Sequence, residues 1–147
     1  MKKLYLLIFL SLIVYSCNLP FGPKGAESPE HLLELCEKYH AKNDVGNMMR
    51  LYKKEGVSKD LIKGKKKTLK KYFDRNTISF GIIELDDKAK TFFNQTYEVQ
   101  GQAIKYNLDL IGQITVSYED SYQEAFLYGK EEDKYFFGLQ VDLNLMK

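Results

Sequence analysis

Two periodicities of apolar residues divide the chain near residue 76. Before that point, apolar residues recur at spacings of three and four, as one face of an amphipathic α-helix requires. After it they alternate with polar residues, which is the period of a β-strand with one buried face. Because no helical pattern separates the later strands, the order predicts an α+β fold with an antiparallel sheet.

Three helices are expected in the first part. Ser28-Pro29-Glu30 combines an N-cap serine, a proline at the first helical position and an acid in the first turn, so a helix should run from there to about Ala41. Asp44 is placed to cap a second, shorter helix. A third helical region begins near Ser58, and Gly64 is a point where it can divide into two pieces.

The strands are expected in segments of alternating character. They read TISFGIIEL, TFFNQTYEV, AIKYNLDLI, ITVSYED, YQEAFLYG and KYFFGLQVDL. Turns are expected at Asp86-Asp87-Lys88, at Gly101-Gln102 and at Lys130 to Asp133. Gly112 fits either a turn or a β-bulge.

The first residues have the composition of an export signal. Lys2 and Lys3 precede an apolar run from Leu4 to Val14, and a small residue, Ser16, follows. Eleven residues are too few for a helix that spans a bilayer, which needs about 20. A cationic start, a short apolar run and a small residue are the plan of a secretory signal peptide.

The sequence "VYSC", which ends at Cys17, resembles a bacterial lipobox. The resemblance implies that residues 1–16 form a lipoprotein signal peptide and that the Cys17 sulfur carries a lipid. It also implies a cell-envelope protein bound to the membrane, and Asn18 after the cysteine favours the outer membrane. Residues 17–27 are rich in proline and glycine and are expected to form a flexible tether. The alternatives are a conventional signal peptide and an uncleaved anchor.

Charge and cysteine content change this picture in two ways. Removing Lys2 and Lys3 leaves 20 basic against 20 acidic residues, so the mature chain gives no reason to expect a nucleic-acid partner. Lipidation of Cys17 would leave Cys36 without a disulfide partner. Cys36 is therefore expected to act as a small buried hydrophobic residue.

The string "SPEHLLELCEKYHAKNDVGNMMRLY" resembles the opening of NTF2-like domains, and "YGKEEDKYFFG" resembles the last hairpin of that family. For residues 28–147 the resemblance implies N-terminal helices packed on a curved antiparallel sheet around an apolar pocket. It also implies a homodimer formed through the open sheet face. A cystatin-like sheet around one helix and an unclassified α+β sandwich are the alternatives.

Few side chains are candidates for chemistry. Asp44 is expected to cap a helix, and His31 and His40 are expected to be solvated or structural. Asp109 should point away from the pocket if the aromatic face of its strand lines it, and Glu84 lies at a strand end or pocket rim. No zinc-spaced cluster, phosphate-binding loop or catalytic triad signature is present, so no metal, cofactor or catalytic residue is assigned.

A lysine-rich segment is the remaining charged feature. Its position between apolar residues indicates the solvent side of an amphipathic helix. The alternative is contact with an anionic membrane or cell-wall surface. The residues assigned to that contact are Lys65, Lys66 and Lys67.

These features predict a lipid-anchored envelope protein that binds a small apolar ligand or another envelope protein without catalysis. The aromatic content of the strands, with 11 Tyr and 9 Phe in the chain, supports an apolar pocket. One alternative is an enzyme similar to ketosteroid isomerase, with a pocket carboxylate and tyrosine donors. A second is an interaction protein whose lysine-rich helix contacts an anionic surface.

Overall fold

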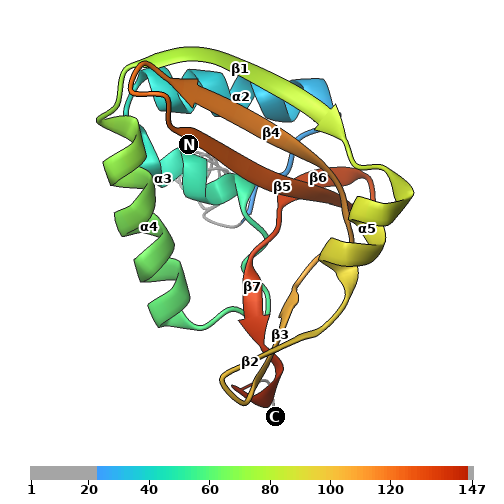
Figure 1. Cartoon of the computed structure of the whole chain (residues 1–147). Helices are drawn as coiled ribbons and strands as arrows, with labels where there is room; N and C mark the ends of the chain where they lie inside the picture. Colours follow the sequence, from blue (N-terminus) through green and yellow to red (C-terminus); the bar gives the residue numbers. More distant parts are fainter. Residues whose placement is uncertain (1–22, 146–147) are drawn as a thin grey trace, which may run out of the picture.

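Four α-helices and two antiparallel sheets make up residues 23–145, the part of the chain that the computed structural model describes (Figure 1). The helices are α2 (Pro29–Ala41), α3 (Val45–Met48), α4 (Lys59–Phe73) and α5 (Asp87–Asn94), with 3-10 turns at Met49–Leu51 and Leu143–Leu145. The strands are β1 (Thr77–Glu84), β2 (Tyr97–Val99), β3 (Gln102–Tyr106), β4 (Leu110–Tyr118), β5 (Gln123–Glu131), β6 (Lys134–Phe137) and β7 (Gln140–Asp142). The predicted α+β class is confirmed.

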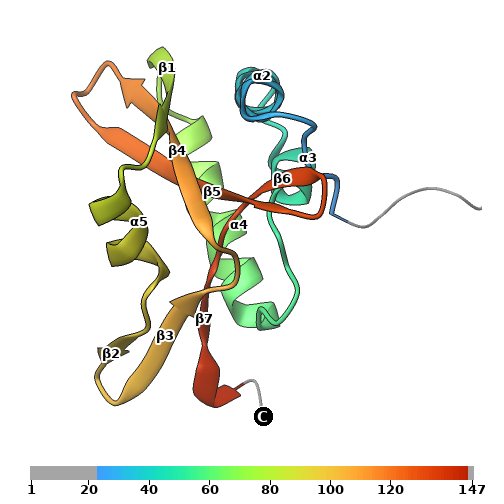
Figure 2. The same ribbon diagram turned by 90° about the vertical axis from the view of Figure 1, so that its right-hand side faces the viewer.

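The larger sheet has the strand order β1-β4-β5-β6, and the smaller one has the order β2-β3-β7. The helices α2 and α3 lie on one side of the curved larger sheet, and α5 lies on the other (Figure 2). The chain leaves the larger sheet after β6 and enters the smaller sheet as β7. The segment predicted as one strand from residue 134 to 143 is therefore two strands in different sheets.

Side-chain caps start the first three helices where the sequence predicts them. The Ser28 hydroxyl accepts a hydrogen bond from the His31 N–H at 3.1 Å, and the Asp44 carboxylate accepts one from the Asn47 N–H at 3.0 Å. Ser58 caps α4 in the same way. The hydrogen bonds that Asp44 accepts from the backbone N–H and the side-chain amide of Asn47 lower the pKa of its carboxylate. The expected break at Gly64 is wrong, since α4 is continuous through it.

The expected turn at residues 86–88 and the strand at residues 91–99 are wrong over most of their length. Asp86 caps α5 by accepting a hydrogen bond from the Ala89 N–H at 2.8 Å, so the chain turns into a helix. Only Tyr97–Val99 remains extended. Phe92 is 56% exposed on α5, so its apolar character did not signal a buried strand face.

The last residues of the predicted tether belong to the domain. Ala26 and Tyr135 exchange two backbone hydrogen bonds, at 2.9 and 2.8 Å. A Cβ atom on Gly25 would lie 2.6 Å from the Phe136 ring, so this close approach requires glycine. The boundary predicted at residue 27 is therefore too late, because Ala26 pairs with the edge of β6 and the Lys24 N–H donates to the Arg50 carbonyl at 2.7 Å. Residues 17–22, including Cys17, lie outside the described residues.

The core lies between α2, α3, α4 and the inner face of the larger sheet. Its fully buried members include Leu32, Cys36, Met48, Leu69, Ile114 and Phe137. Burial raises the pKa of the Cys36 thiol to about 12, so this side chain is a small hydrophobic residue, as predicted. Gly112 lies at a register irregularity in β4, where a Cβ atom would overlap the Tyr128 ring.

Candidate functional site

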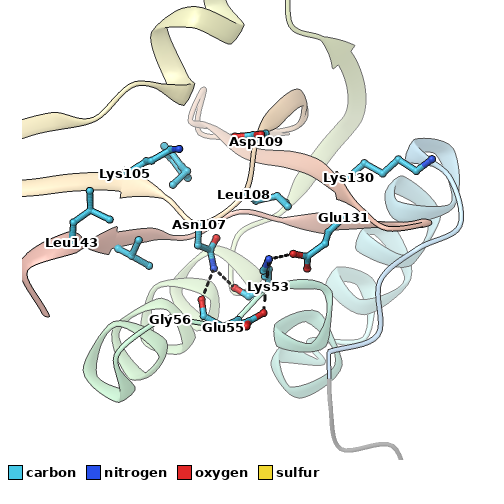
Figure 3. Close-up of a pocket in the computed structure, with 12 residues that line it drawn as sticks. Lys53, Glu55, Gly56, Lys105, Asn107, Leu108, Asp109, Lys130, Glu131 and Leu143 are labelled. Atoms are coloured by element: carbon cyan, nitrogen blue, oxygen red, sulfur yellow. Dashed lines mark hydrogen bonds and ion pairs between the residues drawn. The ribbon is translucent and has the colours of Figure 1, made fainter. Parts of the chain in front are cut away.

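Two open grooves are candidates for a functional site, and the first is polar. It has a volume of about 690 Å³ and lies between the loop after the Met49–Leu51 turn and the β3–β4 connection (Figure 3). Lys53 pairs there with Glu131, and its Nζ atom is 3.9 Å from the Glu55 carboxylate. The Asn107 amide donates to the Lys53 carbonyl at 2.9 Å and accepts from the Leu139 N–H at 2.9 Å.

These bonds give the first groove a structural role. Asn107 replaces the strand hydrogen bonds that would have continued β3, and it ties the loop at Lys53 to the start of β7. This is why the segment predicted as one strand over residues 103–111 is broken between β3 and β4. In the first groove, the polar groups with the strongest interactions are already paired with one another. The second groove is therefore the better candidate for a ligand site.

The second groove, here called the α4–β5 groove, has aromatic walls. It lies between α4, β5 and the connection from β6 to β7, with a volume of about 590 Å³. That volume is within the range of small-molecule sites in proteins. Its apolar lining includes Tyr52, Leu61, Tyr72, Tyr106, Phe126 and Leu139.

One face of α4 forms a wall of this groove. The groove residues of α4 occupy positions i, i+3, i+4, i+7 and i+11, which share one helix face: Leu61, Gly64, Lys65, Thr68 and Tyr72. This spacing is the signal that the sequence offered. The lysine-rich composition obscured it, because it predicts that the lysine run lies mostly on the solvent side of the helix.

Lys65 lies in the α4–β5 groove. Its Nζ atom is 5.3 Å from the centroid of the Tyr52 ring and 5.4 Å from that of the Phe126 ring, which are cation–π distances. Burial lowers the pKa of Lys65, and the negative charge of Glu124 opposes this shift. None of the ion pairs within residues 23–145 involves Lys65.

Tyr52 contributes a second polar group without a partner. Its side chain is 1% exposed, and its hydroxyl makes no hydrogen bond to any described residue. Burial raises the pKa of this hydroxyl well above its ordinary value, so it stays protonated and is a donor. A buried hydroxyl with no partner costs about 1–3 kcal/mol. This hydroxyl is inaccessible from the groove, so only the Tyr52 ring contributes to the groove wall.

A carboxylate beside tyrosine hydroxyls lies on the opposite wall. The Tyr122 hydroxyl donates a hydrogen bond to the Glu124 carboxylate at 2.9 Å. The hydroxyl oxygens of Tyr122 and Tyr72 are 3.0 Å apart, which is also a hydrogen-bond distance. The two tyrosine rings stack at 5.5 Å. The bond to Tyr122 is the largest cause of the raised Tyr72 pKa. Sequence reasoning missed Glu124, because a single acid in an alternating strand has no distinguishing spacing.

The acids that the sequence singled out lie elsewhere. Glu84 is exposed at the end of β1 and is not a pocket residue. Asp109 is exposed, as predicted, and borders the polar first groove. Asp44 caps α3, as predicted. His31 lies in the first turn of α2 and accepts a hydrogen bond from the Glu27 N–H at 3.2 Å.

His40 is a core residue, 5% exposed, so the solvated alternative is wrong and the structural one is right. Its Nε2 atom is 3.2 Å from the Tyr118 hydroxyl, and its ring centroid is 4.6 Å from that of Phe73. The Nδ1 atom is 3.4 Å from the Thr77 hydroxyl. Burial lowers the pKa of His40, which favours the neutral imidazole.

The lowered pKa of His40 predicts a loss of stability in mild acid. Above about pH 6.5 the His40 imidazole is neutral in both the folded and the unfolded chain. As the pH falls below this value, the unfolded chain binds a proton first, which stabilises the unfolded state. The free energy of unfolding should therefore decrease from pH 7.5 to 5.5, measured by urea denaturation. His40→Gln should reduce this decrease, whereas His31→Gln should retain it. An undiminished decrease in His40→Gln would contradict the assignment.

The three lysines assigned to an anionic surface do not share one environment. Lys66 and Lys67 are exposed, whereas Lys65 is half-buried and lies over the Tyr52 and Phe126 rings. Contact of this helix with an anionic surface would therefore involve Lys66 and Lys67, without Lys65. The structure shows Lys65 to be part of the α4–β5 groove.

Comparison with known proteins adds no family to this description. Neither a protein-family model, nor a curated protein, nor a solved structure matches this chain. Within residues 23–145 no three His, Cys, Asp or Glu side chains lie close enough together to hold a metal ion. No helix in that range is long and apolar enough to cross a membrane. The geometry of the α4–β5 groove is therefore the main guide to function.

Proposed function

We propose that this chain is a lipid-anchored cell-envelope protein of NTF2-like form that binds a small apolar ligand in the α4–β5 groove without catalysis. The groove carries the proposal, because aromatic rings line an open space of about 590 Å³ beside the Lys65 amine, which is in none of the ion pairs within residues 23–145. Lipidation at Cys17 would place this groove at a membrane, with the outer membrane favoured by Asn18.

Binding of a neutral fluorescent probe tests the groove. N-phenyl-1-naphthylamine fluoresces more strongly in apolar surroundings, and the domain from residue 23 onward should enhance its emission. Gly64→Leu should reduce this binding at least tenfold, because a Cβ at Gly64 meets open space in the groove wall. The substitution should not weaken the fold, since leucine has a higher helix propensity than glycine.

Gly64→Ala is the matched control, because it makes the same backbone change with little added volume. It should bind the probe nearly as well as the unmodified domain. Equal binding by Gly64→Leu, or no binding by any form, would refute the groove as the ligand site. If the domain turned over a ketosteroid and Glu124→Gln abolished that turnover, the proposed function would be catalysis instead of binding.

The catalytic alternative has one observation in its favour. Glu124 lines the groove and accepts a hydrogen bond from the Tyr122 hydroxyl, so a carboxylate and a tyrosine donor are adjacent, as a general base and a donor would be. However, the groove is open and Glu124 is only half-buried, so the carboxylate does not lie in the enclosed, water-excluding site that such catalysis uses. Binding without catalysis is therefore the better-supported function.

A homodimer through the outer sheet face is part of the same proposal. In the register of the larger sheet, Gly81, Thr115 and Ala125 lie opposite one another, and their small side chains face away from the core. Apart from α5, Figure 2 shows no helix on that side. Small residues on this face would let a second copy pack closely against it.

A further inference from the structure

We infer that the ligand of the α4–β5 groove is an aromatic carboxylate whose acidic group binds Lys65 and whose rings pack on the aromatic wall. The inference rests on the proposed function and adds the chemical class of the ligand. Its starting point is that Lys65 borders the groove and that its amine is in none of the ion pairs within residues 23–145.

The position of Lys65 distinguishes it from the other lysines of α4. Its amine lies over the faces of Tyr52 and Phe126, at 5.3 and 5.4 Å from their centroids. The ring faces stabilise the positive charge but accept no conventional hydrogen bond. The ammonium group therefore keeps its three N–H donors for a ligand, and removal from water makes an anionic acceptor more valuable there.

The walls of the groove select the rest of the ligand. Tyr72 and Tyr106 are half-buried and present ring surfaces on which a flat aromatic body can pack in offset or edge-to-face contact. Tyr52 and Phe126 are only 1% and 2% exposed and lie beneath the Lys65 amine. Leu61 and Leu139 add aliphatic surface. A ligand with a fused ring and one carboxylate would satisfy the apolar walls and the Lys65 amine at the same time.

Two acids also border the groove, and neither pairs with Lys65. Asp60 is exposed in the first turn of α4, where its charge favours the helix N-terminus. Glu124 accepts a hydrogen bond from the Tyr122 hydroxyl and helps to keep Lys65 protonated. Lys65 is in no ion pair within 4.0 Å, so a ligand carboxylate does not have to displace either acid from the amine.

A matched pair of ligands tests the inference. Naphthalene-1-acetate and 2-(1-naphthyl)ethanol share a ring system and differ in charge, and each is titrated against bound N-phenyl-1-naphthylamine. The acid should displace the probe at about a tenfold lower concentration, the size expected for one hydrogen bond to a charged group. Lys65→Met should remove this preference, because methionine retains the apolar stem without the charge.

Two controls separate position from net charge. Lys66→Met removes the same charge from an exposed site on α4 and should leave the preference for the acid intact. Lys65→Arg should also retain it. Equal displacement by the acid and the alcohol, or a preference that survives Lys65→Met, would overturn the inference while leaving apolar binding in place. Failure of the probe itself to bind would overturn the proposed function and this inference together.

Discussion

Replacing Phe137 with alanine should reduce the free energy of unfolding by about 3–5 kcal/mol, the range measured for large aromatic residues removed from protein cores. Phe137 is fully buried at the end of β6. Its ring centroid is 5.2 Å from that of Tyr52 and 5.5 Å from that of Phe126. A small domain has a total stability of about 5–15 kcal/mol, so this single change removes a large fraction of it.

The loss should also affect the groove. Tyr52 and Phe126 form its wall, and both pack on the Phe137 ring, so a cavity at residue 137 removes their support. Urea denaturation should show a lower midpoint with an unchanged slope. Phe92→Ala is the control, because Phe92 is 56% exposed and its removal creates no cavity. Equal stability of the two variants would contradict the core position of Phe137.

Replacing Cys17 with serine should release the chain from the membrane. Each buried methylene of an acyl chain contributes about 0.8 kcal/mol to membrane binding, so the two or three chains of a lipoprotein hold it firmly. Serine offers no sulfur for lipidation. The variant should therefore incorporate no radiolabelled palmitate and should partition into the aqueous phase of a detergent-phase separation.

Cys36→Ala is the matched control for this experiment, because the chain has two cysteines and Cys36 is buried in the core. This variant should remain in the detergent phase and retain the acyl label. Membrane association and labelling of Cys17→Ser at the level of the unmodified chain would refute the lipobox assignment. The result would then favour an uncleaved anchor.

Local signals account for what the sequence predicted correctly about the fold. Ser28, Asp44 and Ser58 each cap a helix within three residues of themselves, so neighbouring residues were enough to locate those helices. The alternation predicted from Ile114 onward matches the buried and half-buried positions of β4 as far as Tyr118. The prediction of a strand near Phe92 is wrong because Asp86, which is also a local signal, was interpreted as part of a turn and not as a helix N-cap.

The candidate site was less accessible to sequence reasoning. Lys65 and Phe126 are 61 positions apart in the numbering, and only the packing of α4 against β5 brings the amine over the ring. Glu124 became a candidate through its contact with Tyr122 and the position of both beside Tyr72. The one available signal was the helical spacing that places Lys65 on the same face as Leu61 and Tyr72.

The sequence by itself determined the α+β class, the starts of the first three helices and the buried character of Cys36. It also carries the export and lipidation pattern at residues 1–17, which remains a prediction. Tertiary structure alone decided that Lys65 faces a groove, that His40 is buried and that Ala26 pairs with β6. The reason is range: caps and periodicity act over a few residues, whereas a groove is made by side chains that meet only after distant segments pack.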